Sequence, residues 1–354
     1  MLVELSVRKL KYYCWFIVLI SLFIASVGCS HKDNAPDVSA IKVKLTHQRL
    51  DKDIANIDTA DIAGGIQQVR AKYPGFLDFY LDTLIGMGVN GNYNIDNPAI
   101  NIGLRSFLTH KDYRGLIDTV MAHYPDTKDV DEKLVKSFKY MKYYFPDFKE
   151  PHVIYMITWL NKWAALTYDT TLGICLDMFL GPNYPIYQAV DIPRYLAVQL
   201  DKEYIPVAAM KAIYRIDHAF INDDRTLLDM MIQKGKEAYF LEKVLPFLPE
   251  ALRLGYTEDQ LKWCYDNEAL VYNFFIRENL LYERNQQKVL RYVIESQSST
   301  GMPQQSPGNI GTWVGLQIVK SYLEAYPKTT LKELINANMD AQKFLQASRY
   351  KPKG

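Results

Sequence analysis

The chain has 354 residues and a formal net charge of +1 at neutral pH, and 13% of its residues are aromatic. Of its 41 basic and 40 acidic residues, three basic and one acidic lie in the first 28 positions, so the rest carries a net charge near −1. No block of like charge stands out, which excludes a nucleic-acid-binding surface because such a surface requires clustered Lys and Arg. No Pro/Gly/Ser linker divides the remainder, which predicts one domain with a large core.

The first 28 residues have the three-part pattern of a secretory signal. Arg8, Lys9 and Lys11 give a positive start, Tyr12–Ala25 is almost wholly apolar, and small residues precede Cys29. This ending is similar to a bacterial lipobox, with Ser26 standing where an aliphatic residue is usual. We therefore predict that residues 1–28 are a signal peptide. We also predict that Cys29 is lipidated, with palmitate among its acyl chains, and anchors the protein to the membrane.

An uncleaved membrane-spanning anchor is the competing interpretation of the same stretch. The apolar run is shorter than the ~18–20 residues that a span requires, and that interpretation leaves the boundary cysteine unexplained. Residues 29–42 are polar and contain Pro36, which is typical of a flexible tether. Within them, Lys32-Asp33 is either a sorting signal to the outer membrane or an ordinary part of the tether. We expect a lipid-anchored protein of the cell envelope, at the outer membrane.

Residues 43–354 are expected to form a single α+β domain that is predominantly helical. Pro206 begins a helical region that runs almost to the end of the chain. The strand-like segments contain β-branched and aromatic residues and predict one small, largely antiparallel sheet. In chain order the expected elements are a strand at Val43–Leu50, helices within Ile57–Tyr80, a loop at Gly86–Asn101, helices within Ile102–Phe145, and strands at His152–Leu160, Trp163–Tyr168 and Thr171–Leu180.

The segment Thr226–Leu245 is predicted to be the central helix. Its apolar residues cover more than half of the helical circumference, so it should be buried on most sides. Lys234 falls inside the apolar arc, whereas Asp229, Gln233, Lys236 and Glu237 fall on the polar side. A lysine on a buried face either has a partner or extends its amine to water, and both alternatives stay open. If a carboxylate faces Lys234, we expect it to come from another element.

Cysteine and histidine patterns bear on disulfides and metal sites. Cys175 and Cys264 either pair in an oxidising compartment or remain two separate buried thiols. Six histidines are present, but no two are four residues apart and HExxH is absent. On the predicted helix Pro206–Phe220, Lys211, Arg215 and His218 share the polar side, and His218 is expected at the surface. We therefore expect no metal and no other cofactor.

Several segments together resemble the gliding-motility lipoprotein family GldB, over essentially all of the mature chain. The resemblance implies a role in gliding motility and the associated protein secretion machinery, with envelope proteins as partners. The segments are Arg49–Asp51, Tyr73–Tyr80, Phe179–Tyr187, Asp224–Pro246, Trp263–Cys264, Asn267–Glu268, Pro307–Gly315 and Ser348–Pro352.

The same layout is similar to a degenerate zincin-like peptidase. Putative zinc proteases related to the family read roughly EGLA where this chain has Lys234-Gly235-Lys236-Glu237. Lys234 would then occupy the place of a zinc-ligand glutamate. Lys211 and Glu268 are the other candidate positions of the degenerate site. Asn309 stands where the resemblance leads us to expect an arginine.

The expected function is that of a non-catalytic envelope lipoprotein, a pseudoenzyme whose zincin-like fold binds proteins or peptides. The alternative is a hydrolase or peptidase with an unrecognised active site. A third interpretation, a structural or cell-wall-binding lipoprotein, rests on the abundance of tyrosine alone.

Overall fold

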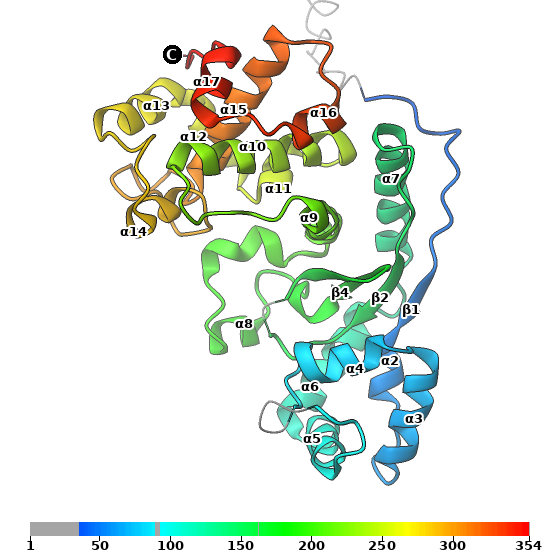
Figure 1. Ribbon diagram of the computed structural model, residues 1–354. Coiled ribbons are helices and arrows are strands. Elements are labelled where there is room, and N and C mark those ends of the chain that lie inside the picture. Colours follow the sequence, from blue (N-terminus) through cyan, green and yellow to red (C-terminus); the bar gives the residue numbers. More distant parts are fainter. Residues whose placement is uncertain (1–34, 89–92, 162, 354) are drawn as a thin grey trace, which may run out of the picture. The chain divides into compact units, whose positions relative to one another are not determined.

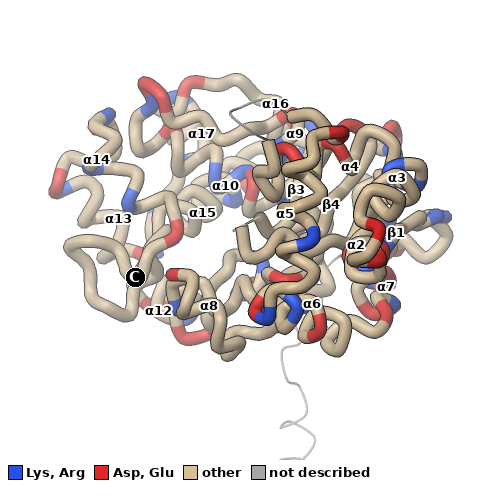
Figure 2. Tube along the Cα trace, turned by 90° about the horizontal axis from the view of Figure 1, so that it is seen from below, with Lys and Arg blue, Asp and Glu red and all other residues tan. Residues whose placement is uncertain are grey.

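The computed structural model describes residues 35–88, 93–161 and 163–353, and Asp37–Gly354 form one compact unit (Figure 1). The predicted signal peptide and Cys29 lie outside the described residues. Within the described ranges no helix is long and apolar enough to cross a membrane. Lys and Arg are scattered over the molecule together with Asp and Glu (Figure 2).

The part of the chain that the structure describes contains one four-stranded sheet, with the order β1-β2-β4-β3. Its strands are β1 (His47–Arg49), β2 (His152–Met156), β3 (Ala165–Tyr168) and β4 (Thr171–Cys175). The central strand β2 is buried from Val153 to Met156. Such an unbroken apolar run is typical of a strand covered on both faces.

The expectation of a largely antiparallel sheet is wrong. Strand β2 pairs in parallel with both β1 and β4, and only β3 and β4 are antiparallel. The β3–β4 hairpin turns at Asp169, whose φ is +50°. The chain first forms β3 at the edge of the sheet and then turns back into β4, which lies between β3 and β2. Strand β4 therefore runs antiparallel to β3 and parallel to β2. The strand lengths were also overestimated, since β1 ends at Arg49 and β2 ends at Met156.

The helices before the sheet and up to the central helix are shorter than the sequence suggested. They are α2 (Leu50–Ala55), α3 (Ile62–Lys72), α4 (Phe76–Phe79), a π-helical turn (Tyr80–Leu84), α5 (Pro98–Thr109), α6 (Lys111–His123), α7 (Lys128–Tyr144), α8 (Pro185–Ala189) and α9 (Ile205–Asp217). Helix α5 begins inside the predicted loop, because Asn97 caps it and Pro98 occupies its first turn.

The central helix is α10 (Leu227–Val244), as predicted. Thr226 and Asp229 form a capping box that fixes its start. The helices after it complete the unit: α11 (Glu250–Leu254), α12 (Glu258–Asp266), α13 (Glu268–Arg277), α14 (Gln286–Val289), α15 (Ile310–Ala325), α16 (Leu331–Asn336) and α17 (Ala341–Ser348).

Helix α10 contributes to two hydrophobic cores. Its C-terminal residues Phe240, Leu241 and Val244 pack into the core around the sheet and α2–α9. Its N-terminal half, including Leu227 and Met231, packs into the core formed by α11–α17. The prediction of a helix buried on most sides is therefore confirmed.

Helix α15 crosses α10 at two glycines, and the two helices lie side by side (Figure 1). A Cβ atom on Gly235 would lie 2.3 Å from the backbone of Gly315. A Cβ atom on Gly315 would lie 1.8 Å from the carbonyl oxygen of Met231. Only glycine permits this approach, which brings the residues beside Gly235 close to α15.

The two thiols of this part of the chain do not pair. Cys175 and Cys264 are both free and buried, so they are two separate apolar side chains in the two cores. Burial raises the pKa of each thiol well above the ordinary value of a cysteine. They are therefore not reactive thiolates at neutral pH.

Candidate binding site around helix α10

Three charged residues within one turn of α10 are enclosed by neighbouring elements. The side chain of Lys234 is 15% exposed. Lys236 and Glu237, expected on the polar side, are only 8% and 6% exposed. That expectation is wrong because α9 and the chain around Ala337 cover the side of the helix that its own periodicity leaves polar.

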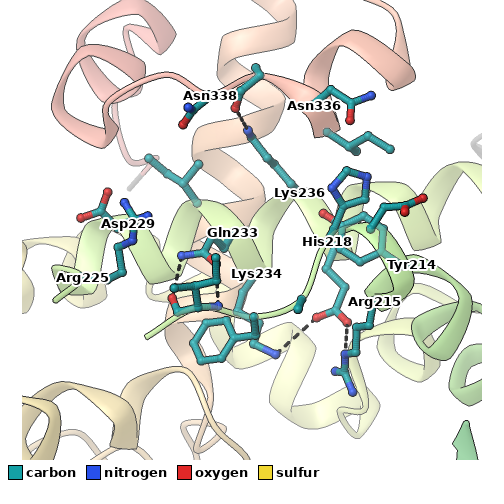
Figure 3. Close-up of a pocket in the computed structure, with 18 of the residues that line it drawn as sticks. Tyr214, Arg215, His218, Arg225, Asp229, Gln233, Lys234, Lys236, Asn336 and Asn338 are labelled. Carbon is teal, nitrogen blue, oxygen red and sulfur yellow. Dashed lines mark hydrogen bonds and ion pairs between the residues drawn. The ribbon is translucent and has the colours of Figure 1, made fainter. Parts of the chain in front are cut away.

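Glu237 is the centre of an ion cluster. Its carboxylate accepts hydrogen bonds from Arg215 Nε at 3.0 Å and from Lys234 Nζ at 3.3 Å (Figure 3). Burial raises the pKa of this carboxyl, but the positive charges of Lys234, Lys211 and Arg215 outweigh burial and hold the pKa below its ordinary value. Glu237 is therefore ionised at neutral pH.

Lys234 does have a carboxylate partner, but that partner is three residues along its own helix. The expectation that it would come from another element is wrong. The second partner of Glu237, Arg215, does come from another helix, α9. The Lys234 amine also lies 4.6 Å from the centre of the Phe220 ring, a cation–π distance. Lys234 is thus a partly buried member of an ion pair and not a lysine that extends freely to water.

Lys211 lies on the inner side of the same cluster. Its amine donates a hydrogen bond to the Tyr204 hydroxyl at 2.7 Å. Burial lowers the pKa of Lys211, yet the neighbouring Tyr204, Glu237 and Glu295 raise it above its ordinary value. A cavity of about 20 Å³, room for one water molecule, is lined by Lys211, Lys234, Glu237, Ala238, Leu241, Arg253, Leu254, Val293, Glu295, Asn309 and Thr312.

Two of the three predicted site residues therefore come together, and the third does not. Lys234 and Lys211 both line the small cavity beside Glu237. Glu268 begins α13 and is 4% exposed, so it is not a solvated acid. Its carboxylate accepts a hydrogen bond from the Tyr350 hydroxyl at 2.9 Å. Asn309, expected to be an arginine, faces the same cavity as Lys234.

A larger pocket of about 510 Å³ opens on the other side of the ion cluster (Figure 3). We call it the outer pocket. Its walls are the end of α9, the chain from Ala219 to Ile221, one side of α10 and the segment Ile335–Met339. Its size is within the ~300–1,000 Å³ typical of ligand sites. The polar side chains in its lining are Arg215, Asp217, His218, Arg225, Asp229, Gln233, Lys234, Lys236, Glu237, Asn336 and Asn338.

Lys236 is the outer-pocket residue that the sequence did not single out. Its Nζ donates a hydrogen bond to the carbonyl oxygen of Ala337 at 2.7 Å and lies 5.6 Å from the centre of the Phe344 ring. Among the described residues no carboxylate lies within 4.0 Å of this amine. Burial lowers the pKa of Lys236 to about 8.

His218 also lines the outer pocket, although we expected it at the surface. It is partly buried, and its ring packs 4.9 Å from that of Tyr214. Burial lowers its pKa, the charge of Asp217 raises it, and the charge of Lys236 lowers it further, so the net pKa lies below its ordinary value. The imidazole is therefore mainly neutral at pH 7.

Comparisons with known proteins give one positive result. A family model described as gliding motility protein GldB matches residues 31–352. No curated protein matches the chain, and no solved structure matches it. In residues 35–88, 93–161 and 163–353, no three His, Cys, Asp or Glu side chains gather as a metal site would require. Since the family model covers nearly the whole chain, this protein belongs to the gliding motility protein GldB family.

Proposed function

We propose that this protein is a non-catalytic lipoprotein of the outer membrane, anchored through Cys29, that supports gliding motility and the associated secretion machinery. It does so by binding a peptide segment of another envelope protein in the outer pocket. The observation that carries the proposal is the pocket itself, whose lining combines hydrogen-bonding side chains with exposed apolar ones. Ile221 and Met339 lie on its lining and are 50% and 40% exposed. A concave site in which polar groups lie beside apolar side chains is suited to recognition of a ligand.

The state of Glu237 supports binding over catalysis. A general acid or base exchanges a proton most readily when its pKa lies near the working pH. Glu237 is instead held ionised between Arg215 and Lys234, so its carboxylate fixes the positions of two cations. The zincin-like ancestry suggested by the sequence fits this interpretation, because Lys234 would fill the position of a metal ligand with a fixed positive charge.

Site-specific photocrosslinking in the native envelope tests the proposal. A photoreactive amino acid is placed at Ile221 or at Met339 of the full-length protein, and at Ile102 on α5 as the control, which is 70% exposed and does not line the pocket. We expect Ile221 and Met339 to give the same crosslinked envelope protein and Ile102 not to give it. Identical products from all three positions would contradict binding in the pocket. Stoichiometric zinc, with a Tm lowered by a chelator, would contradict the non-catalytic assignment.

A further inference from the structure

The Lys236 amine has hydrogen-bonding capacity that the described residues leave unused. An ammonium carries three N–H donors, and Lys236 uses one of them on the carbonyl oxygen of Ala337. The residue is 8% exposed and lines the outer pocket. A buried cation without a carboxylate carries a desolvation cost that an arriving anion offsets.

The carboxylates of the outer pocket do not compensate Lys236. Glu237 is paired with Arg215 and Lys234. Asp229 accepts hydrogen bonds from the Thr226 backbone and hydroxyl as part of the capping box. The remaining carboxylate, Asp217, lies farther than 4.0 Å from any cation of the described residues. The wall around Lys236 therefore presents a positive charge and spare donors.

The chain beside Lys236 is suited to an extended ligand. After α16 the segment from Ala337 to Asp340 is not helical, and its first and last residues have ψ of 114° and 135°. Its middle residues, Asn338 and Met339, are exposed. An exposed non-helical segment can hydrogen-bond a second extended chain through its peptide groups. The Asn336 and Asn338 side chains add amide donors and acceptors to the pocket lining (Figure 3).

We infer that the outer pocket binds an extended peptide through one of its carboxylates, either an acidic side chain or the free C-terminus, with Lys236 as the residue that recognises the anion. The inference rests on the proposed function and names the chemical class of the ligand. Lys234 and Arg215 are less suited to this role because each already donates a hydrogen bond to the Glu237 carboxylate.

Affinity selection from peptide pools tests the inference. Full-length protein, solubilised in detergent and immobilised, is offered two randomised pentapeptide pools, one with free C-termini and one amidated, and the retained peptides are sequenced by mass spectrometry. We expect enrichment of Asp and Glu in both pools if a side chain is bound, or preference for the free-acid pool if the C-terminus is bound. Lys236→Met should reduce the preference for carboxylate-bearing peptides roughly tenfold, since one hydrogen bond to a charged group changes an affinity by about that factor.

The controls separate the possible failures. Lys243→Met changes a lysine of the same helix that pairs with Glu242 and does not line the pocket, and it should keep the preference. Lys236→Arg keeps the charge and should also retain acidic peptides. Retention without any preference for carboxylates, or an equal preference in Lys236→Met, would overturn the inference and leave the proposed function standing. No retention of either pool by the parent protein would overturn both.

Discussion

Glu237 is the residue on which the inner ion cluster depends. It is 6% exposed and faces Arg215, Lys234 and, across the small cavity, Lys211. Removing one cation leaves Glu237 with the others, whereas removing the charge of Glu237 leaves the largely enclosed Lys234 without its carboxylate partner. The two sides of the cluster are therefore not energetically equivalent.

We predict that Glu237→Gln lowers the free energy of unfolding by about 3–5 kcal/mol, because Lys234, whose side chain is 15% exposed, loses its carboxylate partner. Lys234→Met should cost less, about 1–2 kcal/mol, since Arg215 remains bonded to Glu237. Urea unfolding midpoints measure both. The control is Lys262→Met, which breaks an exposed pair with Asp266 and should cost under about 1 kcal/mol. A larger loss for Lys234→Met than for Glu237→Gln would contradict the ranking.

Asp177 is a second buried carboxyl, at the end of the sheet. It accepts hydrogen bonds from the backbone N–H groups of Thr158 at 3.1 Å and Leu160 at 2.7 Å. These bonds hold a turn in which Trp159 and Leu160 have φ of +51° and +60°. Burial raises the pKa of Asp177 to about 6, although the backbone hydrogen bonds act to lower it.

This shift predicts a pH dependence of stability. The pKa of Asp177 in the folded state lies above its unfolded value of 3.8. The contribution of Asp177 to the free energy of unfolding is therefore fully present below pH 3.8 and is lost as pH rises through about 6. Between pH 4.5 and pH 7 the free energy of unfolding of the parent should fall by about 2 kcal/mol relative to that of Asp177→Asn, because the asparagine side chain does not titrate. Urea midpoints of both proteins at the two pH values measure the difference. A constant difference would show that Asp177 has an ordinary pKa.

At the scale of elements, the crossing of α10 and α15 determines where the candidate site lies. Gly235 sits between Lys234 and Lys236, and its contact with Gly315 sets the separation of the two helices. The cavity beside Lys234 includes Asn309 and Thr312, at the start of α15. A change in the helix separation would therefore move α15 relative to the ion cluster.

Gly235→Ala should destabilise the protein by about 1–3 kcal/mol, because the added methyl group overlaps the backbone of Gly315. The effect opposes helix propensity, which favours alanine over glycine by ~1 kcal/mol. The matched control is Gly115→Ala in α6, where a Cβ atom meets nothing within 4 Å and the substitution should be neutral or stabilising. Thermal unfolding compares the two variants. Equal effects would show that the crossing is not tightly packed.

For the whole molecule, the attachment of the N-terminus decides where the outer pocket operates. Cys29 lies outside the described residues, and its lipidation stays a prediction. Cys29→Ala in the full-length chain should move the protein from the membrane fraction to the soluble fraction. Cys14→Ala, within the leader, should leave it in the membrane fraction. Fractionation and the intact mass measure this. A Cys29→Ala protein that sediments with membranes and keeps residues 1–28 would favour an uncleaved anchor.

The sequence by itself determined the elements whose signals are local. Thr226 and the broad apolar arc after it are contained in one segment, so the central helix was predicted with nearly correct ends. The abundance of helix, the family and the likeness of the leader to a lipobox were also readable from short patterns. Lys234 stood out because its angle on an isolated helix is fixed by 3.6-residue periodicity.

The tertiary structure decided which elements lie next to each other. The direction of β4 relative to β2 depends on which side of β4 the hairpin strand takes, and strand composition does not encode this. The burial of Lys236 and Glu237 depends on α9 and the Ala337 segment, which are distant in sequence from them. The periodicity of one helix identifies its apolar face, but packing against other elements determines which polar residues are also enclosed. That is why the partner of Lys234 and the outer pocket emerged only in the folded chain.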